Sequence, residues 1–219
     1  MTLRIAVLAS GRGSNLQAIL DAIAAGTLDA TVAGVWSDRG DAGALERARA
    51  AGIPAQAVRP RDHADRHAHD SALFAAIDAA APELIVCAGY MRLIGAAAVE
   101  GRAGRMINIH PSLLPAFKGL HTHRQALAAG VDEHGASVHF VTADLDGGPV
   151  IAQARVPVHP GDDEAALAQR VLAREHPLLL ETLRWIAAGR VRLNAVGAVQ
   201  IDGRTAAAPL QLAANQRFP

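Results

Sequence analysis

Residues 4–20, RIAVLASGRGSNLQAIL, decide the fold. The first seven residues form a short apolar run of strand-forming side chains, which is typical of a strand buried on both faces. Gly11 and Gly13 break the run, and Ser14 or Asn15 can cap the amphipathic helix that follows. A buried strand, a glycine turn and a helix make the first unit of a parallel α/β sheet.

The same alternation continues as far as residue 111. The elements expected after the first unit are ATVAGVWS at 30–37, a helix at 42–52, PAQAVRP at 54–60, a helix at 64–81, ELIVCAG at 83–89 and RMINIHP at 105–111. Strict alternation of strand and helix predicts a parallel sheet with helices on both faces.

The pattern changes beyond residue 111. A loop leads to a helix, then come two strands that alternate polar and apolar residues and are expected to be antiparallel and half-exposed. The segments are a helix at 121–129, strands at 134–142 and 149–158, a long helix at 162–189 that Pro177 is expected to kink or interrupt, a hairpin at 196–204 and a poorly ordered last dozen residues. The predicted class is α/β: a single-domain, Rossmann-like open sheet with parallel N-terminal and antiparallel C-terminal strands.

The composition limits the class of function. The 219 residues include 21 basic and 21 acidic side chains, so the formal net charge is zero. Nucleic-acid and membrane-surface proteins usually carry a basic excess, which argues against both kinds of partner. Cys87 is the single cysteine and excludes an internal disulfide, and no apolar run approaches the roughly 20 residues that span a bilayer. We expect a cytoplasmic enzyme of small molecules, either monomeric or homodimeric.

The glycine turn after the first strand is a candidate phosphate site. The backbone N–H groups of Gly13, Ser14 and Asn15 are expected to point out of the helix start, where the helix dipole favours an anion. An ordinary tight turn is an equally good interpretation. A dinucleotide is disfavoured, although Asp38 stands where a ribose-binding acid would fall, because Leu16 replaces the third glycine of that motif.

Three polar residues form a candidate catalytic set. Asn108 and His110 stand two apart near the carboxyl end of a predicted strand, so both project from one face. Asp146 lies in the glycine-rich turn LDGGP, from which an acid could return over the sheet. An amide and a protonated imidazole suit the oxyanion of an acyl transfer, and a nearby carboxylate favours the charged imidazole. We therefore expect Asp146 to raise the pKa of His110.

Five ordered motifs extend this interpretation. They are GRGSNLQAI (11–19), AGYMRLI (88–94), NIHPSLLPAFKGLHTHRQAL (108–127), HGASVHFVTADLDGGPVI (134–151) and REH (174–176). Together they resemble the phosphoribosylglycinamide formyltransferases, folate-dependent enzymes of de novo purine synthesis, over nearly the whole chain to about residue 190. The resemblance implies the formyltransferase fold. It also implies transfer of a formyl group from 10-formyltetrahydrofolate, as co-substrate, to the amine of N1-(5-phospho-β-D-ribosyl)glycinamide.

The resemblance also implies roles for individual residues. Asn108, His110 and Asp146 would be catalytic, with His110 as proton donor. Substrate-binding residues would be Gly13, Ser14 and Asn15 at the phosphate, together with Leu172, Ala173, Arg174 and Glu175. The folate would contact Asn108, Asp146, Arg66 at its glutamate tail, Met91, Arg92, Leu93, Ile94, Thr142, Ala143, Asp144 and Leu145. The expected organisation is one domain, 1–219, with a phosphate-binding half (1–104), a catalytic and folate-binding half (105–190) and a C-terminal hairpin and tail (191–219).

Other functions remain open. A formyltetrahydrofolate hydrolase would use a similar Asn–His–Asp set but normally has a regulatory domain before its catalytic domain, whereas this chain begins at the first strand. A methionyl-tRNA formyltransferase would have an additional C-terminal domain and a basic surface. A nucleotide-binding oxidoreductase is the rival from another class, with Leu16 against it. The histidine pairs His67/His69 and His121/His123 lack a third ligand of suitable geometry, so no metal is predicted.

Overall fold

Parallel strands alternate with helices in the first part of the chain. The computed structural model describes residues 2–219, which fall into two units that meet in sequence at Asn108 and Ile109. The elements of the first unit are β1 (Leu3–Leu8), α1 (Ser14–Ala24), β2 (Ala30–Ser37), α2 (Gly43–Ala50), β3 (Ala55–Ala57), the 3-10 turn η1 (Pro60–Asp62), α3 (Arg66–Ala79), β4 (Leu84–Cys87), α4 (Ala96–Glu100) and β5 (Met106–His110), which crosses into the second unit. Only η1 and the short α4 were not expected.

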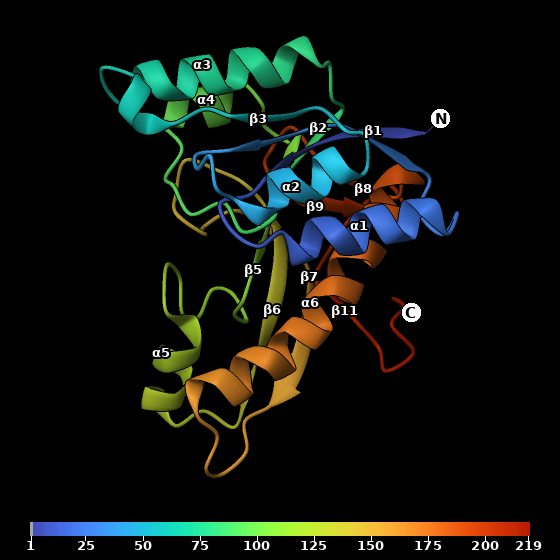
Figure 1. The fold of residues 1–219 in the computed structure, drawn as a ribbon. Helices are drawn as coiled ribbons and strands as arrows, with labels where there is room; N and C mark the ends of the chain where they lie inside the picture. Colours follow the sequence, from blue (N-terminus) through green and yellow to red (C-terminus); the bar gives the residue numbers. More distant parts are fainter. Residues whose placement is uncertain (1) are drawn as a thin grey trace. The chain divides into compact units, whose positions relative to one another are not determined.

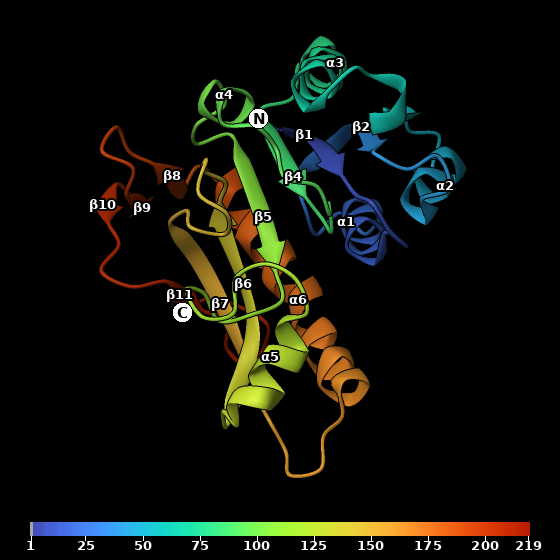
Figure 2. The same cartoon turned by 90° about the vertical axis from the view of Figure 1, so that its left-hand side faces the viewer.

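The strands of the first unit pair in the order β5-β4-β1-β2-β3, and every pair is parallel. Helices α1 and α2 lie on one side of these strands and α3 lies on the other (Figures 1 and 2). The central strands β1 and β4 are almost entirely buried, which explains their apolar sequences. The predicted parallel half of the sheet is confirmed.

The turn between β1 and α1 needs a glycine at residue 13. Gly13 is the N-cap of α1 with φ 75°, in the left-handed region, and no side chain caps the helix. A Cβ atom on Gly13 would lie 2.7 Å from the Cα of Ala44 at the start of α2. The expectation that Ser14 or Asn15 caps the helix is therefore wrong, because the backbone already enters the helix at Ser14.

The second unit is built on two long antiparallel strands and one long helix. Its elements are α5 (Thr122–Ala129), β6 (Glu133–Phe140), β7 (Val150–Pro157), α6 (Glu164–Ala187), β8 (Val191–Leu193), β9 (Val199–Ile201), β10 (Arg204–Thr205) and β11 (Leu210–Gln211). Strands β6 and β7 are antiparallel, as predicted, and α6 lies along them (Figure 1). The helix begins at Asp163, whose carboxylate accepts from the N–H of Ala166, and it continues through Pro177.

The alternating sequence of β6 predicted a half-exposed strand, but the structure buries it. Seven of its eight residues are buried. The loop after β5 covers the polar side chains: the hydroxyl of Ser137 donates to the carbonyl of Ser112 at 2.7 Å and accepts from the N–H of Leu114 at 3.0 Å. Gln153 on β7 donates to the carbonyl of Leu114. The alternation thus marks buried polar groups with hydrogen-bond partners, which a hydropathy pattern cannot distinguish from a solvated face.

The C-terminal residues are ordered, contrary to expectation. Strand β11 pairs with β7, and the ring of Phe218 meets that of Trp185 edge to face, with centroids 5.3 Å apart. Glu181 on α6 accepts from the guanidinium of Arg217 at 2.8 Å and pairs with Arg184 on its own helix. A few tertiary contacts, made by residues spaced along the segment, hold the C-terminal residues in place. The composition of the segment therefore could not predict its order.

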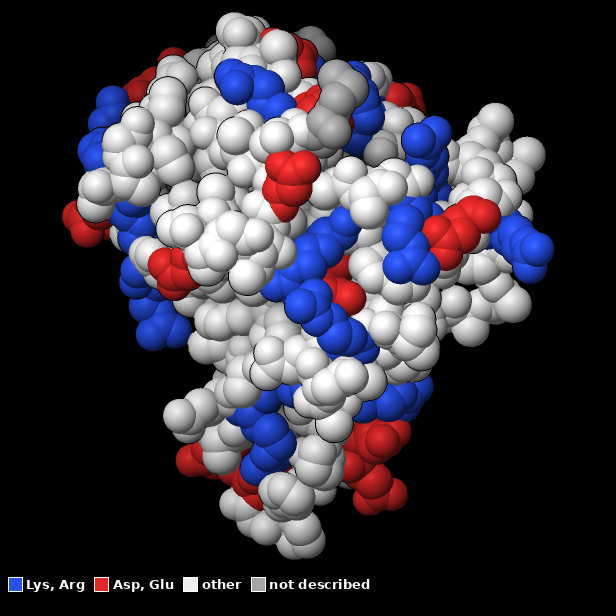
Figure 3. All heavy atoms as spheres, turned by 90° about the vertical axis from the view of Figure 1, so that its right-hand side faces the viewer, with Lys and Arg blue, Asp and Glu red and all other residues white. Residues whose placement is uncertain are grey.

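Charged side chains of both signs are interspersed on the face drawn in Figure 3.

Among residues 2–219, no helix combines the length and apolar character required to cross a bilayer.

We predict that Phe218→Ala lowers the free energy of unfolding by about 3 kcal/mol, because truncating a buried aromatic ring leaves a cavity beside Trp185. Urea denaturation followed by circular dichroism measures the change. Val196→Ala is the matched control, since Val196 is 87% exposed and its truncation should change stability by less than about 0.5 kcal/mol. Equal midpoints for the two variants would show that the tail does not stabilise the fold.

Candidate active site

Asn108 and His110 occupy the carboxyl end of β5, where the strand leaves the sheet. Asn108 is half-buried and is in register with Cys87 of β4. His110 is the last residue of the strand and is only 5% exposed. Because the two residues are separated by one position on an extended strand, they share a face, as expected.

Asp146 lies beside His110. One carboxylate oxygen of Asp146, Oδ2, is 3.5 Å from Nδ1 of His110. Asp146 belongs to the turn between β6 and β7 and has φ 46°, a left-handed conformation that costs an ordinary residue about 1–3 kcal/mol. The turn also requires glycine at 148, because a Cβ there would overlap the carbonyl oxygen of Phe140. The conformation of this turn therefore places the carboxylate of Asp146 beside the ring of His110.

Two further groups hold Asp146, and sequence reasoning missed both. His139 on β6 has Nε2 3.6 Å from Oδ1 of Asp146, and its Nδ1 is 2.9 Å from the carbonyl of Phe140. The N–H of Gly119 donates to Oδ2 at 2.9 Å. The one available signal for His139 was a second histidine in a strand that ends just before the acidic turn.

The other nitrogen of His110 is also engaged. Its Nε2 is 3.0 Å from the carbonyl oxygen of Phe117, so this nitrogen carries a hydrogen that it donates to the backbone. A neutral ring then presents only a lone pair to Asp146, whereas an imidazolium donates to both partners. The segment 117–119, to which the sequence assigned no role, thus contacts both His110 and Asp146.

Opposing effects set the pKa of His110. Burial lowers the pKa of His110 below 6.5, although the Phe117 carbonyl and the charge of Asp146 act in the opposite direction. Burial also raises the pKa of Asp146, but hydrogen bonds from His139 and Gly119 and the charge of His110 hold it below 3.8 overall. Asp146 thus acts on the pKa of His110 in the expected direction, but the net shift is downward, because desolvation of the ring outweighs its acidic neighbour.

Two histidines near His110, His123 and His134, contact each other. Nδ1 of His123 lies 3.2 Å from Nε2 of His134, so one ring donates to the other. Burial, and then the charge of His123, lower the pKa of His134 to about 4. Across residues 2–219, no three His, Cys, Asp or Glu side chains gather in the way a metal ion requires.

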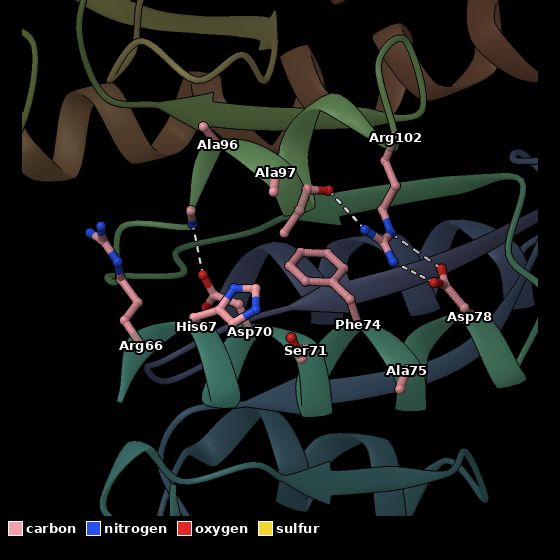
Figure 4. Close-up of a pocket in the computed structure, with 12 residues that line it drawn as sticks. Arg66, His67, Asp70, Ser71, Phe74, Ala75, Asp78, Ala96, Ala97 and Arg102 are labelled. Carbon is pink, nitrogen blue, oxygen red and sulfur yellow. Dashed lines mark hydrogen bonds and ion pairs between the residues drawn. The ribbon is translucent and has the colours of Figure 1, made fainter. Parts of the chain in front are cut away.

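Residues 91–94, which are predicted to bind the folate, include large apolar side chains that are exposed. Met91 and Leu93 are 64% and 55% exposed although both are large and apolar. Arg66, on the first turn of α3, lines a cavity of about 520 Å³ together with residues 95–98, which directly follow this segment (Figure 4). The structure thus brings Arg66 close to the end of the segment, and their folate roles stay predictions.

The remaining predicted residues are placed as follows. Asn15 is 7% exposed, and Gly13 to Asn15 form the start of α1. Residues 142–145 form the outer part of the turn before Asp146, where Lys118 pairs with Asp144 at 3.3 Å.

Residues 172–175 lie within α6, where four consecutive side chains point in different directions. Arg174 donates to the carbonyls of Leu212 and Ala213, and Ala173 is exposed. The run therefore does not form one contact surface, and its substrate role stays a prediction.

The formyl transferase family matches this chain over residues 3–183. The match extends well beyond half of the 219 residues, and the chain therefore belongs to the formyl transferase family.

The family includes similar proteins with a specific name. The chain is 49% identical to a phosphoribosylglycinamide formyltransferase of Escherichia coli K12 over 202 residues, covering 92% of this chain and 95% of the relative. The solved phosphoribosylglycinamide formyltransferase of Coxiella burnetii is 48% identical, covers 94% of this chain and 97% of its own, and superposes with a TM-score of 0.90. The predicted family and fold class are confirmed.

A protein with a different name shares the fold. A solved formyltetrahydrofolate deformylase from Pseudomonas syringae is 26% identical, and its alignment covers 92% of this chain but 66% of its own, with a TM-score of 0.84. The fold alone therefore does not distinguish a formyltransferase from a deformylase. The sequence identities do, because they are higher to the phosphoribosylglycinamide formyltransferases than to the deformylase.

We predict that the imidazole of His110 titrates below pH 6.5 and that Asp146→Asn lowers its pKa further, because the variant loses a charge that favours the imidazolium. Nuclear magnetic resonance of the ring carbons measures both values, and the spectrum of His110→Gln assigns the signal. A pKa above 6.5 in the unaltered protein would mean that Asp146 outweighs burial.

Proposed function

We propose that this protein transfers the formyl group of 10-formyltetrahydrofolate to the amine of N1-(5-phospho-β-D-ribosyl)glycinamide. The products are the N-formyl compound and tetrahydrofolate, and the reaction serves de novo purine biosynthesis. The observation that carries the proposal is the likeness, over nearly the full length of both chains, to relatives named for this reaction. The pairing of His110 with Asp146 supports it with suitable chemistry.

The chemistry requires stabilisation of an oxyanion. As the substrate amine attacks the formyl carbon, a C–N bond forms and the formyl oxygen becomes negatively charged. The carbon's bond to the folate nitrogen then breaks, and a proton passes from the attacking amine to that leaving nitrogen. Donors aimed at the oxyanion are each worth about 3–4 kcal/mol of transition-state stabilisation. The amide of Asn108 and the imidazole of His110 take this role.

His110 offers its donor from Nε2. In the structure this nitrogen donates to the carbonyl of Phe117, an uncharged oxygen at 3.0 Å. The formyl oxygen takes the place of that acceptor and, as its charge develops, pulls the hydrogen more strongly than a carbonyl does. Asp146, on the other side of the ring at 3.5 Å, favours the imidazolium form of His110, whose Nε2–H is a stronger donor to the oxyanion than that of the neutral ring. A buried site strengthens this interaction.

The substrate-binding roles follow the resemblance. Backbone N–H groups of Gly13, Ser14 and Asn15 at the start of α1 bind the substrate's phosphate. The folate contacts residues 91–94 and 142–145, and Arg66 pairs with its glutamate carboxylate. Glu175, buried on α6, contacts the glycinamide or ribose. The proposal also places the protein in the cytoplasm and treats the whole chain as one catalytic domain.

We predict that tetrahydrofolate forms rapidly from 10-formyltetrahydrofolate only when the ribosylated glycinamide is present. Absorbance of the folate product measures this rate with and without the amine. A hydrolase, the alternative that the deformylase likeness keeps in view, would release product equally fast without the amine. That result would contradict the proposed transfer.

We predict that Asp146→Asn lowers kcat by about 100-fold or more, while KM for either substrate changes by less than about threefold, because the lost charge favours the imidazolium that stabilises the oxyanion of the transition state. Steady-state kinetics at several pH values measure the effect. Asp202→Asn, which neutralises an acid that is 53% exposed and pairs with Arg190 away from the candidate site, is the control and should retain most of kcat. Equal turnover of the two variants would make Asp146 structural.

A further inference from the structure

The segment from Tyr90 to Gly95 has no regular secondary structure of its own. Met91 and Leu93 face outward, so burial of their side chains does not fix its course. A flat heterocycle bound by backbone groups nevertheless requires those groups at fixed positions, since misplacement by about 1 Å can cost 100-fold in rate. Other residues must therefore hold the segment from behind.

The first anchor is Ser10, at the end of β1. Its hydroxyl accepts from the N–H of Met91 at 2.9 Å and donates to Oδ1 of Asp38 at 2.5 Å. The backbone N–H of Ser10 also donates to the carbonyl of Gly89. Ser10 is 4% exposed, so these partly buried bonds are shielded on the Ser10 side and fix where the segment begins.

The second anchor is Asp70, on α3. One of its oxygens, Oδ2, accepts from the N–H of Gly95 at 2.7 Å. In Figure 4 the side chain of Asp70 projects from α3 toward the loop that precedes Ala96. Its other oxygen is 3.3 Å from Nδ1 of His69. The ring of His69 is 1% exposed and is tied through Nε2 to the carbonyl of Val58 at 2.9 Å.

The two anchors have the same design. Each uses a buried side chain that binds one backbone N–H of the segment and is itself oriented by a second buried or partly buried group. A buried carboxylate such as Asp70, 5% exposed, is retained only where hydrogen bonds replace its lost hydration. The bond to Gly95 is one of those bonds, so the carboxylate and the segment fix each other.

We infer that Asp70, oriented by His69, and Ser10, oriented by Asp38, are positioning residues for the formyl donor. They hold the two ends of residues 91–95 so that the intervening backbone presents its N–H and carbonyl groups to the folate. The inference rests on the proposed function and adds to it the residues that set recognition of the donor. Neither residue touches the reacting atoms.

Asp70→Ala removes the acceptor of the Gly95 N–H, and hydrogen bonds to charged groups are worth about 1.5–3 kcal/mol. We predict that KM for 10-formyltetrahydrofolate and Kd for tetrahydrofolate rise about 10-fold or more. The value of kcat and the KM for the ribosylated glycinamide should change by less than about threefold. Asp70→Asn, which retains an oxygen for Gly95, should recover most of the affinity. Hydrogen exchange of peptides covering residues 91–95 should be faster in Asp70→Ala than in the unaltered protein or in Asp70→Asn.

Thr182→Val is the matched control, because it removes a buried side-chain hydrogen bond within α6 and none in this segment. It should lower the melting temperature and leave folate affinity unchanged. Ser10→Ala tests the opposite anchor in the same assays and serves if Asp70→Ala does not fold.

An unchanged folate Kd in both Ser10→Ala and Asp70→Ala would overturn the inference, and so would a fall in kcat without loss of folate affinity. Wild-type protein that binds tetrahydrofolate but transfers no formyl group would contradict the proposed function alone. Wild-type protein that binds no folate would contradict both.

Discussion

The carboxylate of Asp146 is the constraint on which the candidate active site depends. It lies between two imidazoles, His110 at 3.5 Å and His139 at 3.6 Å, and takes a backbone N–H from Gly119. The left-handed backbone at Asp146 and the crowded glycine at 148 show that the turn is shaped to deliver this one acid. Strain of this kind persists only where the surrounding structure determines it fully, as the buried β6 and β7 do here.

Two electrostatic effects compete at His110. Burial favours the neutral ring and currently prevails, while the Phe117 carbonyl and Asp146 favour the charged ring. The neutral ring of His110 donates its Nε2 hydrogen, and the carboxylate of Asp146 is already beside the ring to balance the positive charge of the imidazolium form. The same burial that lowers the pKa of the ring strengthens its interaction with Asp146, because both act in a medium of low dielectric constant. Burial of the site is therefore the common cause of the lowered pKa of His110 and of the stronger attraction between its imidazolium form and Asp146.

The sequence predicted what depends on local pattern and missed what depends on tertiary contact. The β1 strand, the Gly13 turn and the position of Asn108 and His110 follow from periodicity and glycine chemistry, and each was predicted within a few residues. His139 and the Phe117 carbonyl were missed because their roles come from a meeting of β6, the loop after β5 and the acidic turn. The burial of β6 was missed for a related reason: Ser137 is polar, yet its partners are supplied by residues 112–114. The anchoring of Phe218 likewise depends on Trp185, more than 30 positions earlier in the sequence.

The central claim is that Asp146 acts through His110. A double-mutant cycle on kcat tests it most directly, with Asp146→Asn, His110→Asn and the two combined. If the residues act as one unit, the double variant is about as slow as the slower single variant, because the second substitution removes nothing that remains in use. If the two losses multiply, so that the double variant is slower by the product of the single effects, Asp146 acts independently of His110 and the account is wrong.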